Sequence, residues 1–206
     1  MKKILILSLC FFMNSLISFS QEDRKSSNWS ASVNYGTGNA TLKHNVLGVL
    51  NGTVDALQLG VNYKLSEKND FFLSSGLNVV SFKATYFNDT NQSVLNNTYF
   101  QMPFSINDKW IFSSSEKLYT VYGIGLYVNY LGRSVIEDYS EDTKLKTTGF
   151  NFGGFINWGF GYDLSDNSAI DLGVNYMIDS DPIKKNGIDQ KLDEMLIVRI
   201  GYIKRF

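Results

Sequence analysis

The sequence predicts an all-β protein, an eight-stranded antiparallel up-and-down β-barrel that spans a membrane. Three observations indicate this fold. Segments after residue 20 alternate apolar and polar side chains with the two-residue period of a β-strand. Their connections alternate between long and short, which is the layout of outer-membrane barrels. The last segment, residues 195–206, alternates over a full strand length and ends on the aromatic Phe206.

The first four predicted strands cover residues 28–36, 57–65, 71–82 and 99–112. Long polar segments at 37–54 and 84–97 and a short turn at 66–70 connect them. In the third strand the pairs Phe71–Phe72 and Val79–Val80 break strict alternation, which leaves its register open at both ends and allows a β-bulge. Pro103 removes a ladder donor from the fourth strand, so we expect a bulge or kink there.

The last four predicted strands cover residues 122–130, 150–163, 170–178 and 195–206. The turns at 113–117 and 165–168 are short, whereas the segments at 132–148 and 179–193 are long. Eight is the smallest strand number of such barrels. The alternation predicts a barrel in the outer membrane of a Gram-negative bacterium, with periplasmic turns, extracellular long loops and both termini in the periplasm.

The N-terminal residues have the pattern of a secretory signal. A basic start precedes an apolar run at 4–13, and Ser18 and Ser20 are small residues at −3 and −1 of a cut before Gln21. The run is too short for a spanning helix. The sequence therefore predicts a signal peptide at 1–20 cleaved between Ser20 and Gln21, a short segment at 21–27, and the barrel at 28–206.

Composition excludes several functions. Cys10, the only cysteine, lies inside the predicted signal peptide, so the mature chain has no disulfide and no thiolate metal site. Of the 19 basic residues two precede residue 21, which leaves 17 against 20 acids. Nothing in this balance suggests nucleic acid as a partner. We expect neither a cofactor nor a bound metal.

The position of glycine decides which face of the barrel looks outward. A soluble lipocalin-like barrel would place its apolar face inside, and alternation alone does not separate the two. A narrow eight-stranded lumen needs small residues, and the polar face carries ten glycines: Gly36, Gly60, Gly76, Gly123, Gly125, Gly153, Gly159, Gly161, Gly173 and Gly201. Only Gly154 lies on the apolar face. The apolar, aromatic-rich face is therefore predicted to face lipid.

Several stretches of the sequence resemble the PorT-like outer-membrane β-barrel domain family. They are the signal peptide ending in Ser20–Gln21, the segments at 99–104 and 122–127, and the terminal Phe206. The resemblance covers Trp29–Phe206, although Gln101 stands where an acid is expected. It implies an outer-membrane location. A member of the family belongs to a protein-secretion system.

The final strand also resembles the assembly signal of outer-membrane barrels in general. Phe206 matches the terminal aromatic residue and Tyr202 the aromatic residue spaced before it. The resemblance implies recognition by the barrel-assembly machinery during biogenesis. Lys204 departs from the apolar residue often found between these two positions, and we place its ammonium at the periplasmic interface.

Five charged residues are predicted to face the lumen as a charge network: Lys64, Asp163, Asp171, Arg199 and Arg205. The turn at 165–168 would place the two carboxylates opposite one another, where they repel unless a cation joins them. Arg205, near the same end, is the expected cation. A network that plugs the lumen is favoured over an ion site, because a narrow polar lumen must satisfy its own groups.

A catalytic site is not predicted. His44, the only histidine, falls in the first long loop without the neighbouring serine and acid of a hydrolase triad. The acidic Asp179-Ser-Asp181 segment lacks the further ligands and the glycine of a calcium loop.

The leading hypothesis for the function is a small, porin-like, monomeric outer-membrane barrel with a plugged lumen. It would act as a structural or surface-interaction protein through its loops, with outer-membrane lipid and lipopolysaccharide as neighbours. The alternatives are a barrel component of a secretion or envelope-assembly machine with an envelope protein partner, a lipid-modifying enzyme, and a soluble secreted barrel.

Overall fold

The computed structural model describes residues 28–206 except 66–69, 89–90, 113–116, 138–141 and 146–147. The predicted signal peptide, its cut at Ser20–Gln21 and the segment at 21–27 lie outside the described residues. Among the described residues no helix is long and apolar enough to cross a membrane. The strands are β1 (Trp29–His44), β2 (Gly48–Lys64), β3 (Phe71–Asn88), β4 (Asn91–Ile111), β5 (Leu118–Glu137), β6 (Asp142–Leu145), β7 (Gly149–Ser165), β8 (Ser168–Asp179), β9 (Ile183–Lys185) and β10 (Ile188–Arg205).

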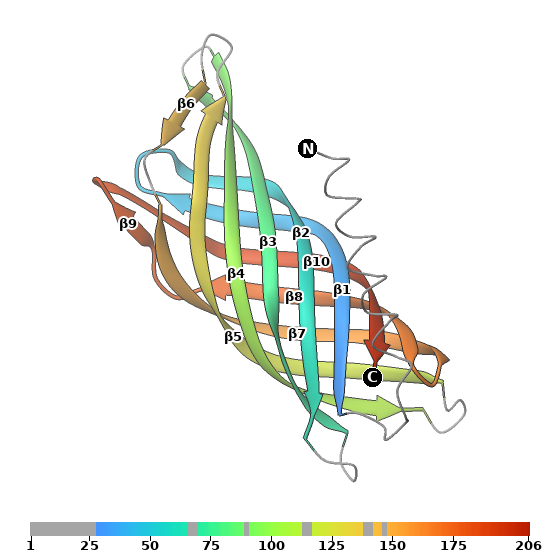
Figure 1. Ribbon diagram of the computed structural model, residues 1–206. Helices are drawn as coiled ribbons and strands as arrows, with labels where there is room; N and C mark the ends of the chain where they lie inside the picture. The colour runs from blue at the N-terminus through green and yellow to red at the C-terminus, as the bar shows by residue number, and fades with distance from the viewer. Residues whose placement is uncertain (1–27, 66–69, 89–90, 113–116, 138–141, 146–147) are drawn as a thin grey trace.

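Eight of these strands close into a ring, as the sequence predicts. The order is β1-β2-β3-β4-β5-β7-β8-β10, all neighbours pair antiparallel, and β10 pairs back onto β1 from Ser30↔Arg205 to His44↔Gln190. The short strands β6 and β9, which were not predicted, pair with β5 and β10. Closure leaves no free edge in the ring. The start of β1 and the C-terminus lie at one end, which we call the near rim (Figure 1).

The four predicted long loops are wrong, because most of their residues continue the strands. β1 runs to His44 and β2 starts at Gly48, so the expected loop at 37–54 is a strand pair with a tight turn. β3 and β4 likewise pair out to Asn88↔Asn91. These strands rise well beyond the shorter β7 and β8 (Figure 1). We call this part the extension; it comprises residues 37–44, 48–55, 81–88, 91–98, 132–137 and 188–194.

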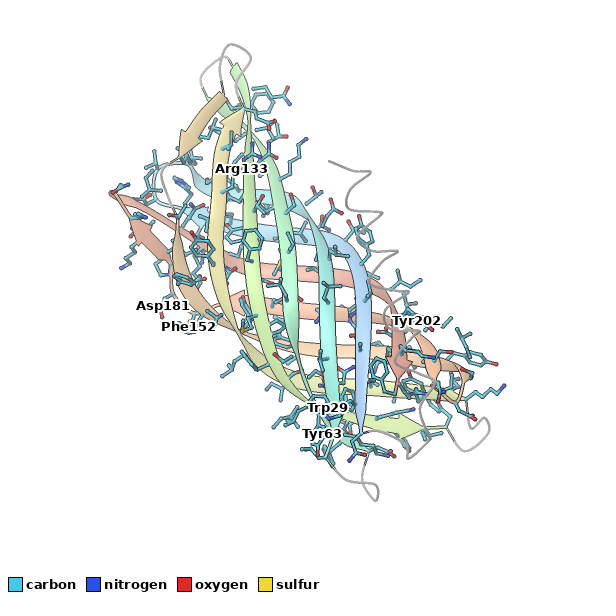
Figure 2. The ribbon with its side chains drawn as sticks, viewed as in Figure 1. Trp29, Tyr63, Arg133, Phe152, Asp181 and Tyr202 are labelled. Atoms are coloured by element: carbon cyan, nitrogen blue, oxygen red, sulfur yellow. The ribbon has the colours of Figure 1, made fainter. Side chains whose placement is uncertain are left out.

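The outer surface below the extension is an apolar belt. Ile124 and Leu126 are 67% and 71% exposed, and β10 adds Val198 and Ile200. Side chains this apolar and this exposed, all around a closed barrel, match the lipid-facing band of a transmembrane barrel. Trp29 and Tyr63 pack ring against ring, 4.7 Å apart, at the near rim (Figure 2), where aromatic residues meet lipid headgroups.

The extension reverses this polarity. Along β1 and β2 the outward residues above Tyr35 and Leu57 are polar except for Val49, whereas the inward residues become apolar. The inward apolar side chains of the extension, together with four from the strand residues directly below it, form what we call the extension core. Its main members are at most 6% exposed: Leu42, Leu50, Val54, Val80, Phe82, Leu95, Leu131, Leu192, Met195 and Ile197. The belt therefore has the polarity predicted for a membrane barrel, whereas the extension has the polarity of the soluble barrel that was the alternative.

The β-bulge that the sequence allowed in β3 does not occur in its pairing with β2 and β4, and both breaks in the alternation have another cause. Pairing with β2 and β4 keeps one register throughout. Phe72 points into the lumen at the near rim, and Val80 is the first buried residue of the extension core. At Pro103 the β3–β4 pairing is interrupted between Ser75↔Phe104 and Asn78↔Gln101 and resumes without a register shift. The missing amide hydrogen of proline accounts for the interruption.

Candidate functional site: the barrel lumen

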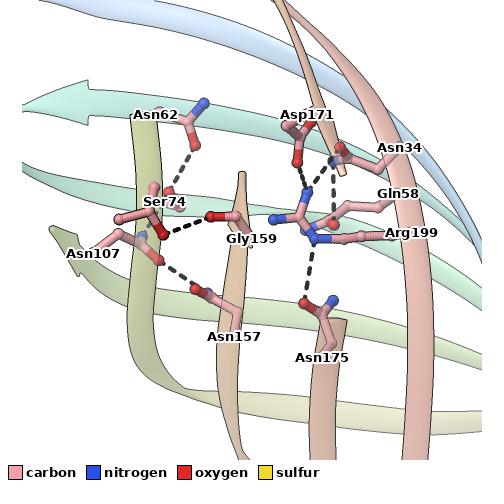
Figure 3. A network of polar contacts seen from close by, with 11 residues as sticks. Asn34, Gln58, Asn62, Ser74, Asn107, Asn157, Gly159, Asp171, Asn175 and Arg199 are labelled. Atoms are coloured by element: carbon pink, nitrogen blue, oxygen red, sulfur yellow. Dashed lines mark hydrogen bonds and ion pairs between the residues drawn. The ribbon is translucent and has the colours of Figure 1, made fainter. Parts of the chain in front are cut away.

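Arg199 of β10 is the centre of a polar cluster that crosses the lumen (Figure 3). It forms an ion pair with Asp171 of β8. Its Nε donates to Asn175 Oδ1 at 3.3 Å and its Nη1 to Asn34 Oδ1 at 3.2 Å. The side chains of Arg199 and Asp171 are 15% and 10% exposed, so the pair is largely buried. Gly201 lies between Asn34 and Asp171, and a Cβ there would collide with an oxygen of each.

A second charged cluster lies at the near rim. Arg205 and Lys109 reach Asp163 at 2.5 and 3.5 Å, and the Lys109 ammonium sits 3.8 Å from the centre of the Tyr119 ring. Two cations thus share one carboxylate, and the ring face holds one of them by cation–π attraction. The expected reach of Arg205 to a lumen carboxylate is therefore present in the structure, with Asp163 as that carboxylate.

The predicted opposition of Asp163 and Asp171 is wrong. In the β7–β8 ladder Asp163 faces Ala169, whereas Asp171 faces Gly161, and the register shifts between Asp163 and Ser165. Each carboxylate therefore meets its own arginine, and the predicted single network is two clusters. Lys64 belongs to neither, because it forms its ion pair with Asp70, 3.6 Å away, where both side chains are more than 40% exposed. Sequence reasoning missed Lys109, although the alternation places it on the same polar face as Ser105 and Asn107.

Uncharged side chains form a separate chain of hydrogen bonds along the inner wall, from β7 to β1. Asn157 of β7 donates to Asn107 of β4, which donates to Ser74 of β3, both at 2.9 Å. Ser74 donates in turn to Asn62 at 2.6 Å (Figure 3). Asn62 donates to Ser30 at 3.2 Å. This chain of hydrogen bonds joins side chains of five strands and fills part of the lower lumen with polar groups.

A row of amides runs around the inner wall at one pairing level. Each member faces the next across a strand pair, over six neighbouring strands: Asn34, Gln58, Asn78, Gln101, Asn129 and Asn151. Gln101 and Asn129 have no exposed surface. The row separates the polar lower lumen from the apolar extension core. The sequence shows these amides singly, and only the registers of five ladders place them in line.

The space inside the barrel narrows from the near rim upward. A cavity of about 320 Å³ opens at the rim beside Lys64, Lys109 and Arg205, and about 90 Å³ remains around Arg199 and Asn34. The upper cavity is therefore less than a third of the size of the rim cavity. Above it the extension core is closed by side chains such as Leu42 and Phe82, which are fully buried. The lumen is therefore filled in its middle and closed at the extension.

The C-terminal residues lie at the near rim. Tyr202 pairs with Val33 and Ile170, and the Phe206 amide donates to the Trp29 carbonyl at 3.2 Å. Lys204 pairs with Ala31 beside this rim, one residue before the end of β10. Figure 2 shows Tyr202 near the end of the barrel that carries Trp29 and Tyr63. The positions fit an interfacial anchor, and recognition by an assembly machine stays a prediction.

His44 is not a loop residue. It ends β1 inside the extension, 4% exposed, and its Nδ1 accepts hydrogen bonds from the amides of Val46 and Leu47 at 3.2 Å each. These contacts with the backbone hold the β1–β2 turn. Within the described part of the chain, no group of three or more His, Cys, Asp or Glu side chains could hold a metal ion.

The β1–β2 turn is expected to loosen in acid. Burial lowers the pKa of His44 below its usual 6.5, so the unfolded turn binds a proton that the folded turn resists. The stability from neutral His44 is present above pH ~6.5 and is lost as pH falls below it. Hydrogen exchange at Val46 and Leu47, corrected for intrinsic rates, should show constant protection above pH ~6.5 and falling protection below. In His44→Gln this pH dependence should vanish; its persistence would assign the effect to another group.

The fold is similar to solved structures, although no sequence comparison finds a relative. No protein-family model and no curated protein sequence matches the chain. The structure is similar to the neisserial surface protein NspA, with a TM-score of 0.54 and 16% identity over 89% of this chain and 100% of that one. It also aligns with OprG from Pseudomonas aeruginosa (TM-score 0.49, 13% identity, 88% and 97% covered) and Ail of Yersinia pestis (0.40, 10%, 84% and 97%). The fold is that of a small outer-membrane β-barrel.

Proposed function

We propose that this protein is a non-conducting, monomeric outer-membrane barrel of a Gram-negative bacterium that presents the extension as a rigid interaction platform at the cell surface. The reversal of polarity along β1–β5 and β10 carries the proposal. Apolar residues outside and polar residues inside suit lipid, whereas polar residues outside and an apolar core suit water. The near rim would then face the periplasm, and the extension would stand outside the cell.

Lipid and lipopolysaccharide would surround the belt. Tyr202 and Phe206, at the near rim, would serve the barrel-assembly machinery from the periplasmic side. The closed core supports a platform rather than a pore, because the route through the barrel meets the Arg199 cluster and then buried apolar side chains. The buried, turn-holding position of His44 supports a non-enzymatic role.

Electrical recording tests the platform proposal. The purified barrel in planar bilayers should give no discrete conductance steps, while a general porin in the same bilayers gives them. Cell fractionation should place the chain in the outer membrane with heat-modifiable gel mobility, and a cysteine at Thr85, exposed on the extension, should react with an impermeant maleimide on intact cells. Uniform conductance steps would overturn the closed lumen, and an unreactive Thr85→Cys in folded protein would overturn the orientation.

A second candidate, a barrel component of a secretion or envelope-assembly machine, rests on the PorT-like resemblance. The two segments that carry it pair with each other, with Pro103 of β4 opposite Tyr127 of β5. Tyr127 is buried and donates its hydroxyl to Asp179 at 2.7 Å. We propose that these segments share a packing role inside the barrel. An envelope protein that co-purifies after cross-linking through the extension would favour this candidate over a free-standing platform.

A further inference from the structure

Two Asn-x-Thr triplets lie side by side on the outer face of the extension. Asn39 of β1 pairs with Thr53 of β2, and Thr41 of β1 pairs with Asn51 of β2. The four side chains point outward, and we call them the Asn–Thr patch. Thr41 Oγ1 donates to Asn51 Oδ1 at 3.0 Å. The side chains of Asn39 and Thr53 are exposed and bond to no other described residue, so their donors and acceptors face the solvent.

The patch lines a groove that crosses the upper boundary of the belt. The groove has a volume of about 660 Å³, and its floor below the patch consists of Tyr176 and Leu196. These residues pair with each other, and Leu196 also pairs with Asn39, so one row runs from the belt to the patch. Glu194, opposite Thr41, lines the same groove. One end of the groove is thus apolar and aromatic, and the other offers amides, hydroxyls and a carboxylate.

This polarity matches a membrane lipid with a sugar head. Amides and hydroxyls both donate and accept, as sugar hydroxyls do. A tyrosine ring presents an apolar face at the level where a head joins its chains. Phosphate is a poorer match, because Glu194 repels it and Lys43, above the patch, is held by Asp193 at 2.8 Å. Lys83 pairs with Thr53 and forms no ion pair among the described residues, so a sugar-free anionic lipid is the competing ligand.

We propose that this groove binds a glycolipid of the surrounding leaflet, with the sugar on the Asn–Thr patch and the acyl chains against Tyr176 and Leu196. The site rests on the proposed function, since the groove meets a leaflet surface only if the belt is embedded. It gives the platform a lipid ligand held at a defined place on its wall, on the β8-β10-β1-β2 side.

Binding to lipid nanodiscs tests the site. The folded barrel is reconstituted in phosphatidylcholine discs, and the retention of diglucosyl diacylglycerol and of phosphatidylglycerol is measured by native mass spectrometry. The wild type should retain the diglucosyl lipid preferentially. Asn39→Ala/Asn51→Ala should weaken that retention roughly tenfold, because two hydrogen-bonding amides are lost. The control is Asn96→Ala/Thr98→Ala, which removes an amide and a hydroxyl from the outer face of β4, away from the groove.

The outcomes separate the site from the proposed function. Heat-modifiable gel mobility reports a folded, embedded barrel for each variant. If the wild type lacks this mobility, the proposed function itself is overturned. With the wild type embedded, equal retention of the diglucosyl lipid by both double variants would overturn the site. Preferential retention of phosphatidylglycerol would overturn the sugar ligand and assign the groove to an anionic head at Lys83.

Discussion

Replacing Arg199 with Met should lower the free energy of unfolding by about 3–5 kcal/mol, because it leaves the Asp171 carboxylate buried without a counter-charge. The ion pair is 15% and 10% exposed, and Asn34 and Asn175 hold the guanidinium in place. Equilibrium unfolding in urea, in detergent micelles or bilayers, measures the loss. The double variant Arg199→Met/Asp171→Asn should recover much of it, since the buried charge is gone as well.

Arg205 supplies the matched control. It too pairs with an inward aspartate, but its side chain is 28% exposed at the near rim and Asp163 keeps Lys109 as a second cation. Arg205→Met should therefore cost less than about 1 kcal/mol, as exposed ion pairs usually do. A loss as large as that of Arg199→Met would contradict the division into a buried cluster and a rim cluster.

The sequence predicted the ring and its belt because these depend only on the two-residue period. Leu196, Val198 and Ile200 alternate with Ile197, Arg199 and Gly201, and the position of glycine identifies the inner face. Strand length was underestimated because residues 37–54 are rich in Gly and Asn, which are typical of loops. The alternation nevertheless continues there through Leu42, Leu50 and Val54, with apolar residues on the other face. A test of each face along the whole segment would have found the extension.

Contacts between distant strands could not be predicted in the same way. Asp163 and Asp171 flank one turn, and symmetry about it suggested that they meet, but the shift between Asp163 and Ser165 moves each opposite a small residue. A one-residue change of register alters every partner on the face. The same limit hid the amide row, since its six members come from six strands. Face is a local property of the chain, whereas register depends on the closed ring.

Truncating Phe82 to Ala should cost about 3–5 kcal/mol, the usual range for a large aromatic side chain lost from a core. Phe82 has no exposed surface and packs with Val54 and Leu95 in the extension core, and its ring lies directly against Gly52. Because the cavity opens inside the extension, we expect the amides of β2 and β3 there to exchange faster with solvent, while the amides of the belt keep their protection.

Phe87→Ala is the control on the same strand, because Phe87 points outward and is 78% exposed. Its cost should stay within about 0.5 kcal/mol, as for most surface substitutions. Phe82 and Phe87 thus lie five residues apart on one strand, one buried inside the barrel and the other exposed outside. In a lipid-facing wall we would expect the apolar side chains to point outward and the inward side chains to be polar. Equal costs for Phe82→Ala and Phe87→Ala would show that the upper strands hold no water-facing core, and the polarity reversal would fail with them.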